Sequence, residues 1–213
     1  MLYVRWLIVL LVVGVVGCTS DDSKTDAGPG VTGVTATPQR TRVLQKLAAI
    51  DNSQVKLGAE FNRTMLRVQV QSFGFNESES VCIAGTIEKK LGTAFESATI
   101  AGLSANPSLS PESLLPCSTP QRLTELTKNA KGPDFSKVNQ NDLRQVLTKW
   151  FGAGYERAGL RSAEAVCLSQ AIVSALPQDQ LGAAFKGGAS ASIALDQSLD
   201  GCVTQQRQLE LAG

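Results

Sequence analysis

The chain has 213 residues, of which 43% are apolar and 18% are charged, enough for one medium folded domain or two small ones. The 20 basic and 19 acidic residues nearly cancel, so no nucleic-acid partner is expected, and the absence of histidine removes the commonest general base and transition-metal ligand. Alanine, leucine and serine are abundant and runs of β-branched residues are few, a composition that favours an all-α fold.

The N-terminal segment has the pattern of an export signal. Arg5 precedes an apolar run over residues 6–16, which is too short for a membrane-spanning helix of about 20 residues. The sequence Val15-Val16-Gly17-Cys18 that ends this run is similar to the lipobox of bacterial lipoproteins. The resemblance implies that residues 1–17 are removed as a signal peptide. It also implies that Cys18 receives a lipid, with palmitate among its acyl chains. The alternative is an uncleaved anchor or an ordinary signal peptide.

Residues 18–40 are rich in Ser, Thr, Asp, Gly and Pro and have no apolar period, as expected of a flexible tether. The lipid and the tether together predict an exported protein that is held to the extracytoplasmic side of a cell membrane. The remaining residues, 41–213, form the predicted body.

The sequence of the body predicts two helical units of about four helices each, at residues 41–128 and 137–213, joined by a linker at 129–136. Each unit should begin with a helix that ends at a glycine, followed by a second helix, a short helix and a last helix that carries a cysteine. In the first unit we expect helices at 53–73 and 81–91, with Gly74 as the terminator of the first and a capping box of Asn76 and Glu79 before the second. Ser110-Pro111 should open the last helix of this unit. Pro116 should break that helix, a feature that the second unit lacks. In the second unit we expect a helix from Asp142 to about Ala158 that is capped by Asn141 and terminated by Gly159. Further helices are expected from Ser162 to Leu176, from Gln178 to Phe185, and from Ser190 or Ser192 through Cys202.

The two units have related sequences. A shift of 85 positions superimposes Cys82 and Cys117 on Cys167 and Cys202 without a gap. The same shift aligns 16 pairs of identical residues that are spread over residues 74–126. The clearest match joins Thr119, Gln121-Arg122 and Glu125-Leu126 to Thr204, Gln206-Arg207 and Glu210-Leu211. We therefore interpret the body as a tandem duplication.

The four cysteines of the body predict one disulfide bond in each unit. An exported location favours oxidation, and a unit that closed its own bond before duplication would pair Cys82 with Cys117 and Cys167 with Cys202. The alternative is a metal or iron–sulfur site. Such sites draw on closely spaced cysteines, which this sequence lacks. No metal or other cofactor is therefore expected.

Two further groups of residues are candidates for function. Glu79 and Glu164 occupy equivalent positions, as do Arg122 and Arg207. They could provide an acid–base or anion-binding pair, a Glu–Arg pair across each unit, or only helix-end and surface charges. The second group is an aromatic cluster, for which we expect a packing role: Trp150, Phe151 and Tyr155.

These features favour a non-enzymatic protein of the cell envelope that binds a partner protein or a ligand, in a groove between the two units. One alternative is a carboxylate-dependent envelope enzyme that uses Glu79 and Glu164. Another is a structural or assembly protein without a ligand pocket.

Overall fold

In the computed structural model, residues 37–52, 54–99, 114–128, 132–185 and 188–213 are described. These residues form an all-α fold, with no β-strand among them. None of the helices in this part of the chain is long and apolar enough to cross a membrane. The predicted signal peptide, Cys18, nearly all of the predicted tether, and the Ser110-Pro111 helix start lie outside the described residues.

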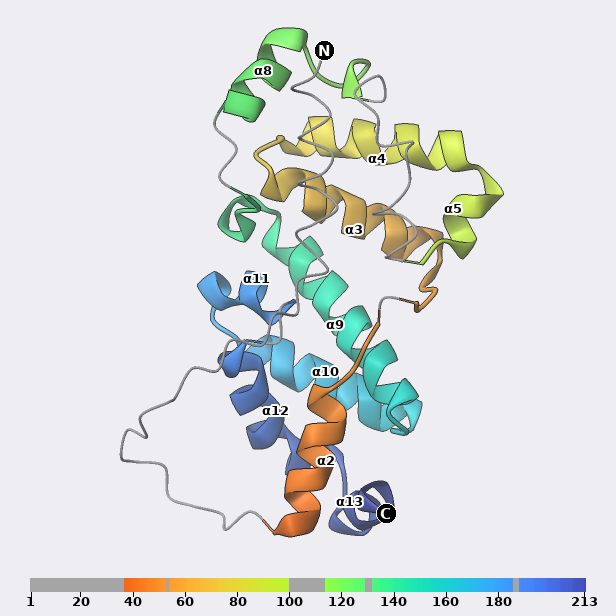
Figure 1. The fold of residues 1–213 in the computed structure, drawn as a ribbon, viewed down its shortest axis with the longest axis vertical. Coiled ribbons are helices and arrows are strands. Elements are labelled where there is room, and N and C mark those ends of the chain that lie inside the picture. The colour runs from red at the N-terminus through yellow and green to blue at the C-terminus, as the bar shows by residue number, and fades with distance from the viewer. Residues whose placement is uncertain (1–36, 53, 100–113, 129–131, 186–187) are drawn as a thin grey trace.

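The first unit lies at one end of the long axis of the molecule (Figure 1). It consists of α3 (Gly58–Ser72), α4 (Glu77–Leu91), α5 (Thr93–Ser97) and α8 (Pro120–Lys128). Gly74 follows the end of α3 as the expected terminator, and its φ of 93° favours a residue without a Cβ. Asn76 and Glu79 form the predicted capping box at the start of α4. The unit has a small core of its own, which includes Leu66, Val70, Phe75, Ile83, Ile87 and Phe95.

The second unit occupies the other end of the molecule and has the larger core. It consists of α9 (Gln140–Arg157), α10 (Ser162–Ala175), η3 (Gln178–Gln180), α11 (Leu181–Ala184), α12 (Ala189–Cys202) and α13 (Gln205–Ala212). A short 3-10 turn, η2 (Phe135–Lys137), precedes α9. Gly159, with a φ of 103°, ends the α9 segment as predicted. The fully buried side chains of this core include Leu143, Leu147, Leu168, Ile172, Leu181 and Leu199.

Helix α3 belongs to both cores and joins the two units. Leu66 and Val70 face the first core, whereas Phe61, Met65 and Val68 are buried in the second. The side chain of Gln71 reinforces this junction, because its Oε1 accepts a hydrogen bond of 2.8 Å from the backbone N–H of Asn139. The two units therefore share apolar packing along α3 and are not separated by a linker alone.

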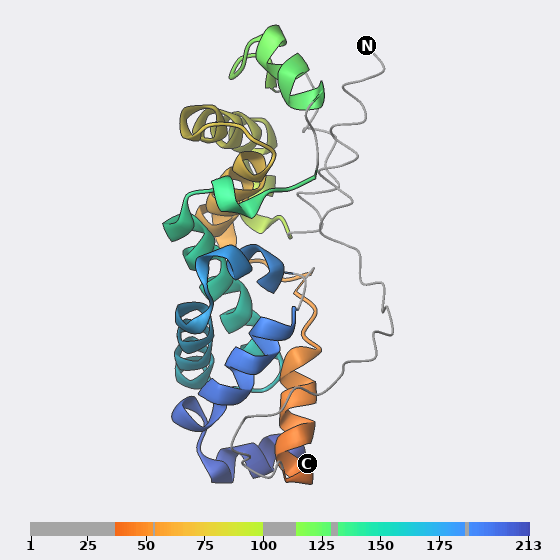
Figure 2. The same cartoon turned by 90° about the vertical axis from the view of Figure 1, so that its left-hand side faces the viewer.

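The first helix in chain order packs on the second unit and not on the first. Helix α2 (Pro38–Ala48) lies beside α12 and α13 in both views (Figure 1 and Figure 2). Its buried residues, Val43 and Leu47, belong to the larger core. Residues 38–40, which were predicted as tether, form the first turn of this helix. The expected boundary of the first unit at residue 41 therefore does not coincide with the division between the two cores.

Both predicted disulfide bonds are present. Cys82 is bonded to Cys117 and Cys167 to Cys202, and the Cα–Cα distance is 5.5 Å in each pair. The first bond joins α4 to the segment immediately before α8, and the second joins α10 to the end of α12. Each unit is thus cross-linked internally, by a bond between its second helix and the segment that precedes its last helix.

Several predicted helix starts were wrong, among them residue 81 for α4, which begins at Glu77. Helix α9 is capped by Asn139, not Asn141, because Asn139 Oδ1 accepts hydrogen bonds from the backbone N–H groups of residues 141 and 142. The helix predicted from residue 53 begins at Gly58. Helix α12 reaches Cys202 as predicted, but a further helix that was not predicted follows it, because Val203 is extended and Thr204 starts α13 by accepting a hydrogen bond from the backbone N–H of Arg207.

Candidate functional site

A cavity that is lined mainly by polar side chains lies between α2 and α13. This α2–α13 groove has a volume of about 480 Å³ and is bounded by the first turns of both helices and by the end of α12. Its lining residues are Thr37, Gln39, Arg40, Asp200, Val203, Gln205, Gln208 and Leu209. The volume lies within the range of about 300–1,000 Å³ that is typical of small-ligand sites.

Local sequence explains why both helices begin at the groove. Thr37 is extended and its hydroxyl accepts a hydrogen bond from the backbone N–H of Arg40, while Pro38 occupies the first helical position, where no N–H is needed. Thr204 starts α13 in the same way. Two helix N-termini, each with a positive partial charge, therefore lie at the edge of one groove.

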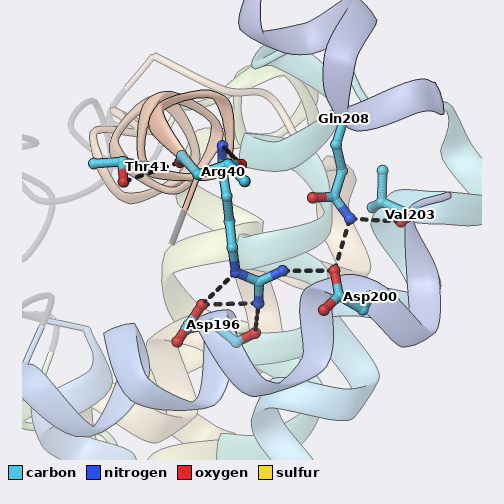
Figure 3. Close-up of polar contacts among 7 residues, drawn as sticks. Arg40, Thr41, Asp196, Asp200, Val203 and Gln208 are labelled. Carbon is cyan, nitrogen blue, oxygen red and sulfur yellow. Dashed lines mark hydrogen bonds and ion pairs between the residues drawn. The ribbon is translucent and has the colours of Figure 1, made fainter. Parts of the chain in front are cut away.

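Arg40 lines the groove and fixes α2 to α12 (Figure 3). Its Nη1 donates to Asp200 Oδ1 at 2.6 Å, and its Nε and Nη2 donate to Asp196 Oδ1 at 3.0 and 2.8 Å. Nη2 also donates to the backbone carbonyl of Asp196 at 2.6 Å. Only 13% of the Arg40 side chain is exposed. Asp196 and Asp200 are four residues apart on α12, so both face the same arginine.

The charges of this cluster support one another. Burial lowers the pKa of Arg40, but hydrogen bonds from Arg40 to Asp200 and Asp196 outweigh that effect and raise it. The pKa of Asp200 lies below its ordinary value, first because Gln208 donates a hydrogen bond to it and also because Arg40 does. Arg40 and Asp200 therefore stay charged at neutral pH, which maintains the ion pair between them.

Gln208 connects the cluster to the groove. The residue is 8% exposed, and its Nε2 donates to Asp200 Oδ1 and to the carbonyl of Val203, both at 2.9 Å. Since both partners are acceptors, the orientation of the amide is defined. Oε1 is not one of the buried atoms that lack a hydrogen-bond partner, so the defined role of Gln208 is to hold the start of α13 against the end of α12.

The residues of this site, Arg40, Asp196, Asp200 and Gln208, were not predicted from the sequence. One signal could have found Arg40. The tetrapeptide Thr37-Pro38-Gln39-Arg40 recurs as Thr119-Pro120-Gln121-Arg122 and, with one change, as Thr204-Gln205-Gln206-Arg207. In all three places the threonine hydroxyl accepts a hydrogen bond from the arginine N–H three residues later. Only the last two occurrences entered the comparison of the two units.

The predicted glutamates and arginines lie elsewhere and pair with one another inside each unit. Arg122 Nε lies 3.6 Å from Glu79 Oε1, and Arg207 Nε lies 3.5 Å from Glu164 Oε2. Each arginine also donates through Nη2 to the carbonyl of the terminator glycine, Gly74 or Gly159, at 2.7 Å. These contacts hold the last helix of each unit against the turn between its first two helices.

The two glutamates also cap the helices that carry them. Glu79 Oε2 accepts from the backbone N–H of Asn76, and Glu164 Oε2 accepts from that of Arg161, at 2.8 Å in both cases. Ser118 adds a hydrogen bond of 2.8 Å to Glu79 Oε1. Each carboxylate is therefore engaged by an arginine and by a helix N-terminus, and neither lines the α2–α13 groove.

The aromatic cluster is divided between packing roles. Tyr155 and Phe151 are buried and their rings stack at 5.9 Å, and burial raises the pKa of the Tyr155 hydroxyl. Trp150 is partly buried and meets the ring of Phe185 edge to face at 5.7 Å. None of these rings lines the groove.

A second, smaller cavity of about 220 Å³ lies where α2 and α9 end. Its two basic residues already cap backbone carbonyls: Lys46 Nζ donates to the carbonyl of Leu211, and Arg157 Nη1 donates to that of Asp51. Such cations are typical of helix C-termini. Within the described residues, no three potential metal-ligating side chains come together in this cavity or elsewhere. Neither cavity lies between the two units, where a groove was expected.

Comparison with known proteins adds no family to this description. No protein-family model, no curated protein and no solved structure matches the chain.

Proposed function

We propose that this protein is an exported lipoprotein whose folded body binds a ligand in the α2–α13 groove. The observation that carries the proposal is the α2–α13 groove itself, a cavity of about 480 Å³ that is lined mainly by polar side chains and has a volume typical of small-ligand sites. A carboxylate-dependent enzyme has less support, because Glu79 and Glu164 are each paired with an arginine and lie outside the groove. A purely structural role would leave the groove unexplained.

The position of the groove suits a membrane-anchored protein. Thr37, the first described residue, lines the groove, and 19 positions separate it from Cys18. A flexible chain of that length and composition spans about 25 Å on average. If Cys18 carries the lipid, the groove therefore lies close to the membrane surface, where it would meet ligands of the cell envelope.

We also propose that the body arose by tandem duplication of one disulfide-closed unit. The shift of 85 positions that aligns the sequences also aligns the two disulfide bonds, the two terminator glycines and the two Glu–Arg contacts. If the Glu–Arg contacts are inherited equivalents, Arg122→Ala and Arg207→Ala should lower the free energy of unfolding by similar amounts, roughly 1–2 kcal/mol each. A loss confined to one of the two variants would count against the duplication.

The lipid anchor is tested by expressing the full chain in a bacterial host beside a Cys18→Ser variant. The expected wild-type product loses residues 1–17, gains the mass of a lipid and partitions into detergent. The variant is expected to show none of these three changes. A wild-type protein that keeps its first 17 residues, or that is cleaved without gaining lipid, would refute the anchoring part of the proposal.

Ligand binding is tested with the low-molecular-weight fraction of a bacterial envelope and a matched pair of variants. Leu209 lines the groove and is 54% exposed, whereas Ile193 lies outside its lining on α12 and is 57% exposed. We expect the fraction to raise the melting temperature of the mature protein and of Ile193→Asp but not of Leu209→Asp. An equal rise in all three proteins, or none in any, would refute binding in the groove.

A further inference from the structure

The two disulfide bonds differ in their exposure to solvent. Cys82 is exposed in the first bond, and Cys117 is partly buried. Both cysteines of the second bond, Cys167 and Cys202, are partly buried. A disulfide bond is exchanged by a thiolate that reaches one of its sulfurs, so the rate depends on access to that sulfur. An incoming thiolate therefore has better access to the first bond, at Cys82, than to the second.

A hydroxyl group beside the first bond favours its cleavage. Thr86 Oγ1 lies 3.6 Å from Cys117 Sγ, and the hydroxyl is the donor because a sulfur in a disulfide bond carries no hydrogen. When the bond is attacked at Cys82, Cys117 leaves as a thiolate, and the same hydrogen bond stabilises this leaving group. The shift of 85 positions places Ala171, whose side chain has no donor, at the equivalent point of the second unit.

The surroundings of the two bonds also differ. Leu115, two positions before Cys117, is 50% exposed. The equivalent residue of the second unit is Asp200, whose carboxylate is paired with Arg40. This ion pair fixes α2 to the end of α12, two positions before Cys202. A helix therefore packs beside the second bond, whereas an exposed apolar side chain adjoins the first.

The first bond also holds the least buried of the long helices in place. Helix α8 lies at one end of the long axis of the molecule (Figure 1 and Figure 2), and of its nine described residues only Leu123 is buried. The bond fixes the chain at Cys117, three positions before α8 begins. By contrast, α13 has two buried residues and packs against α2. Opening of the first bond therefore weakens the attachment of α8 more than opening of the second weakens that of α13.

We propose that the Cys82–Cys117 bond is a redox-sensitive latch on α8, which a dithiol opens ahead of the Cys167–Cys202 bond. One thiolate of the dithiol attacks Cys82 Sγ and forms a mixed disulfide, while Cys117 leaves as a thiolate beside the Thr86 hydroxyl. The second thiolate of the dithiol then attacks its own sulfur in the mixed disulfide and releases Cys82. The dithiol loses two electrons and two protons, and the two cysteines gain them as thiols. This latch is independent of the α2–α13 groove and of any ligand bound there.

The test follows both bonds in the folded protein. Residues 18–213, with Cys18→Ser, are incubated with increasing dithiothreitol, and the free thiols are alkylated and located by peptide mass spectrometry. We expect Cys82 and Cys117 to be alkylated first, roughly tenfold faster than the second pair, at a rate proportional to the dithiothreitol concentration. Once the first bond is open, amide hydrogen exchange should show that α8 loses protection while α13 keeps it.

Variants of Thr86 test the role of its hydroxyl. Thr86→Val keeps the shape of the side chain and removes the donor. It should slow reduction of the first bond about fivefold, the factor that corresponds to one hydrogen bond of ordinary strength. Thr86→Ser should restore most of the rate, and neither variant should change reduction of the second bond. Equal rates in wild type and Thr86→Val would overturn the assignment of Thr86.

Three results would overturn the proposal as a whole. The first is reduction of the second bond before the first bond or together with it. The second is an α8 that keeps its protection after the first bond is reduced. The third concerns the route, because reduction that requires unfolding would be faster in Phe95→Leu, by the factor that this variant adds to the unfolded fraction. Attack on the folded unit predicts the same rate in Phe95→Leu and wild type, since Phe95 lies in the core on α5, beyond the far end of α4.

Discussion

Arg40 is the residue through which the start of the chain is fixed to its end. It lies on α2 and reaches Asp196 and Asp200 on α12, more than 150 positions further along the sequence. Arginine suits this position because its planar guanidinium can donate in several directions at once. The two aspartates are half exposed, so solvent screens part of each ion pair, and the cluster is better described as a set of hydrogen bonds than as a source of large electrostatic energy.

Replacement of Arg40 by alanine should loosen α2 and leave two unpaired carboxylates one turn apart. We expect the free energy of unfolding to fall by about 1–2 kcal/mol, or several degrees in melting temperature for a chain of this size. Arg42→Ala is the matched control, because Arg42 lies on the exposed side of the same helix. Equal effects of the two substitutions would show that the cluster does not hold α2 in place.

The depressed pKa of Asp200 predicts a pH dependence of the same contact. A carboxyl whose pKa in the folded state lies below the ordinary 3.8 stabilises the fold above that pH, and this contribution is lost as the pH falls through the folded-state pKa. Asp200→Asn should therefore be less stable than wild type at about pH 6, and the difference should shrink below about pH 3.8. Denaturant unfolding of both proteins across this range measures it. A difference that stays constant would contradict the assignment.

At the scale of elements, the close approach of a loop to α9 depends on one glycine. The backbone carbonyl of Trp150 accepts a hydrogen bond of 2.7 Å from Asn52, a fully buried residue of the loop after α2. A Cβ on Gly154 would lie 2.5 Å from Ile50 Cδ1 and 2.8 Å from Asn52 Nδ2. The loop therefore packs on α9 in the space that a side chain at position 154 would occupy.

Gly154→Ala should displace this loop and destabilise the protein by about 1–3 kcal/mol, the usual effect of overpacking. Gly152 provides a control in the same helix, because a Cβ there would lie 3.5 Å from Ser169 Oγ, an ordinary contact. Gly152→Ala should be neutral or slightly stabilising, since alanine favours a helix. Thermal unfolding of both variants measures the effect. Equal stability of the two would mean that the loop does not require the space at Gly154.

The start of α13 illustrates how short signals compete within an element. The apolar period of α12 would allow the helix to continue beyond Cys202, but Val203 adopts an extended conformation and Thr204 caps a new helix. In the first unit, α8 also begins one residue after a threonine. In each unit the threonine, Thr119 or Thr204, caps the last helix, because its hydroxyl accepts a hydrogen bond from the backbone N–H of the arginine three residues later. The proline at position 116 is therefore not needed to explain the break.

At the scale of the whole molecule, the two units differ in how much core they possess. The first has a small core, and the second adds residues from α2 and α3 to its own. A small core leaves a unit dependent on other constraints, and a disulfide bond is the most effective of these. The Cys82–Cys117 bond is therefore expected to matter more for the first unit than the Cys167–Cys202 bond does for the second.

Removal of one disulfide bond at a time tests this asymmetry. By the chain-entropy estimate, loss of a bond across 35 positions lowers the free energy of unfolding by about 3–4 kcal/mol. We expect the double variant Cys82→Ala, Cys117→Ala to unfold in two steps, the first unit melting before the second. The matched variant Cys167→Ala, Cys202→Ala should keep a single, lower transition. Amide hydrogen exchange in each unit distinguishes the two patterns, and two-step unfolding of the second variant alone would contradict the expectation.

The sequence by itself determined the helical class, the pairing of the four body cysteines, and the turn at each terminator glycine. These features follow from local composition, from short spacing and from comparison of one half of the chain with the other, all of which a linear sequence contains. The Glu–Arg contacts were among the alternatives that the sequence left open, because a recurring charge can equally face solvent.

Only the tertiary structure decided where α2 packs and what lies beside it. Helix α2 has two buried residues, Val43 and Leu47, and such a short apolar stripe does not specify its partner. Its position depends on contacts with α12 and α13, at the far end of the chain, and the groove exists because those three helices meet. Cavities and long-range hydrogen bonds are properties of the packed chain, so no local pattern could have placed Gln208 in the lining of one.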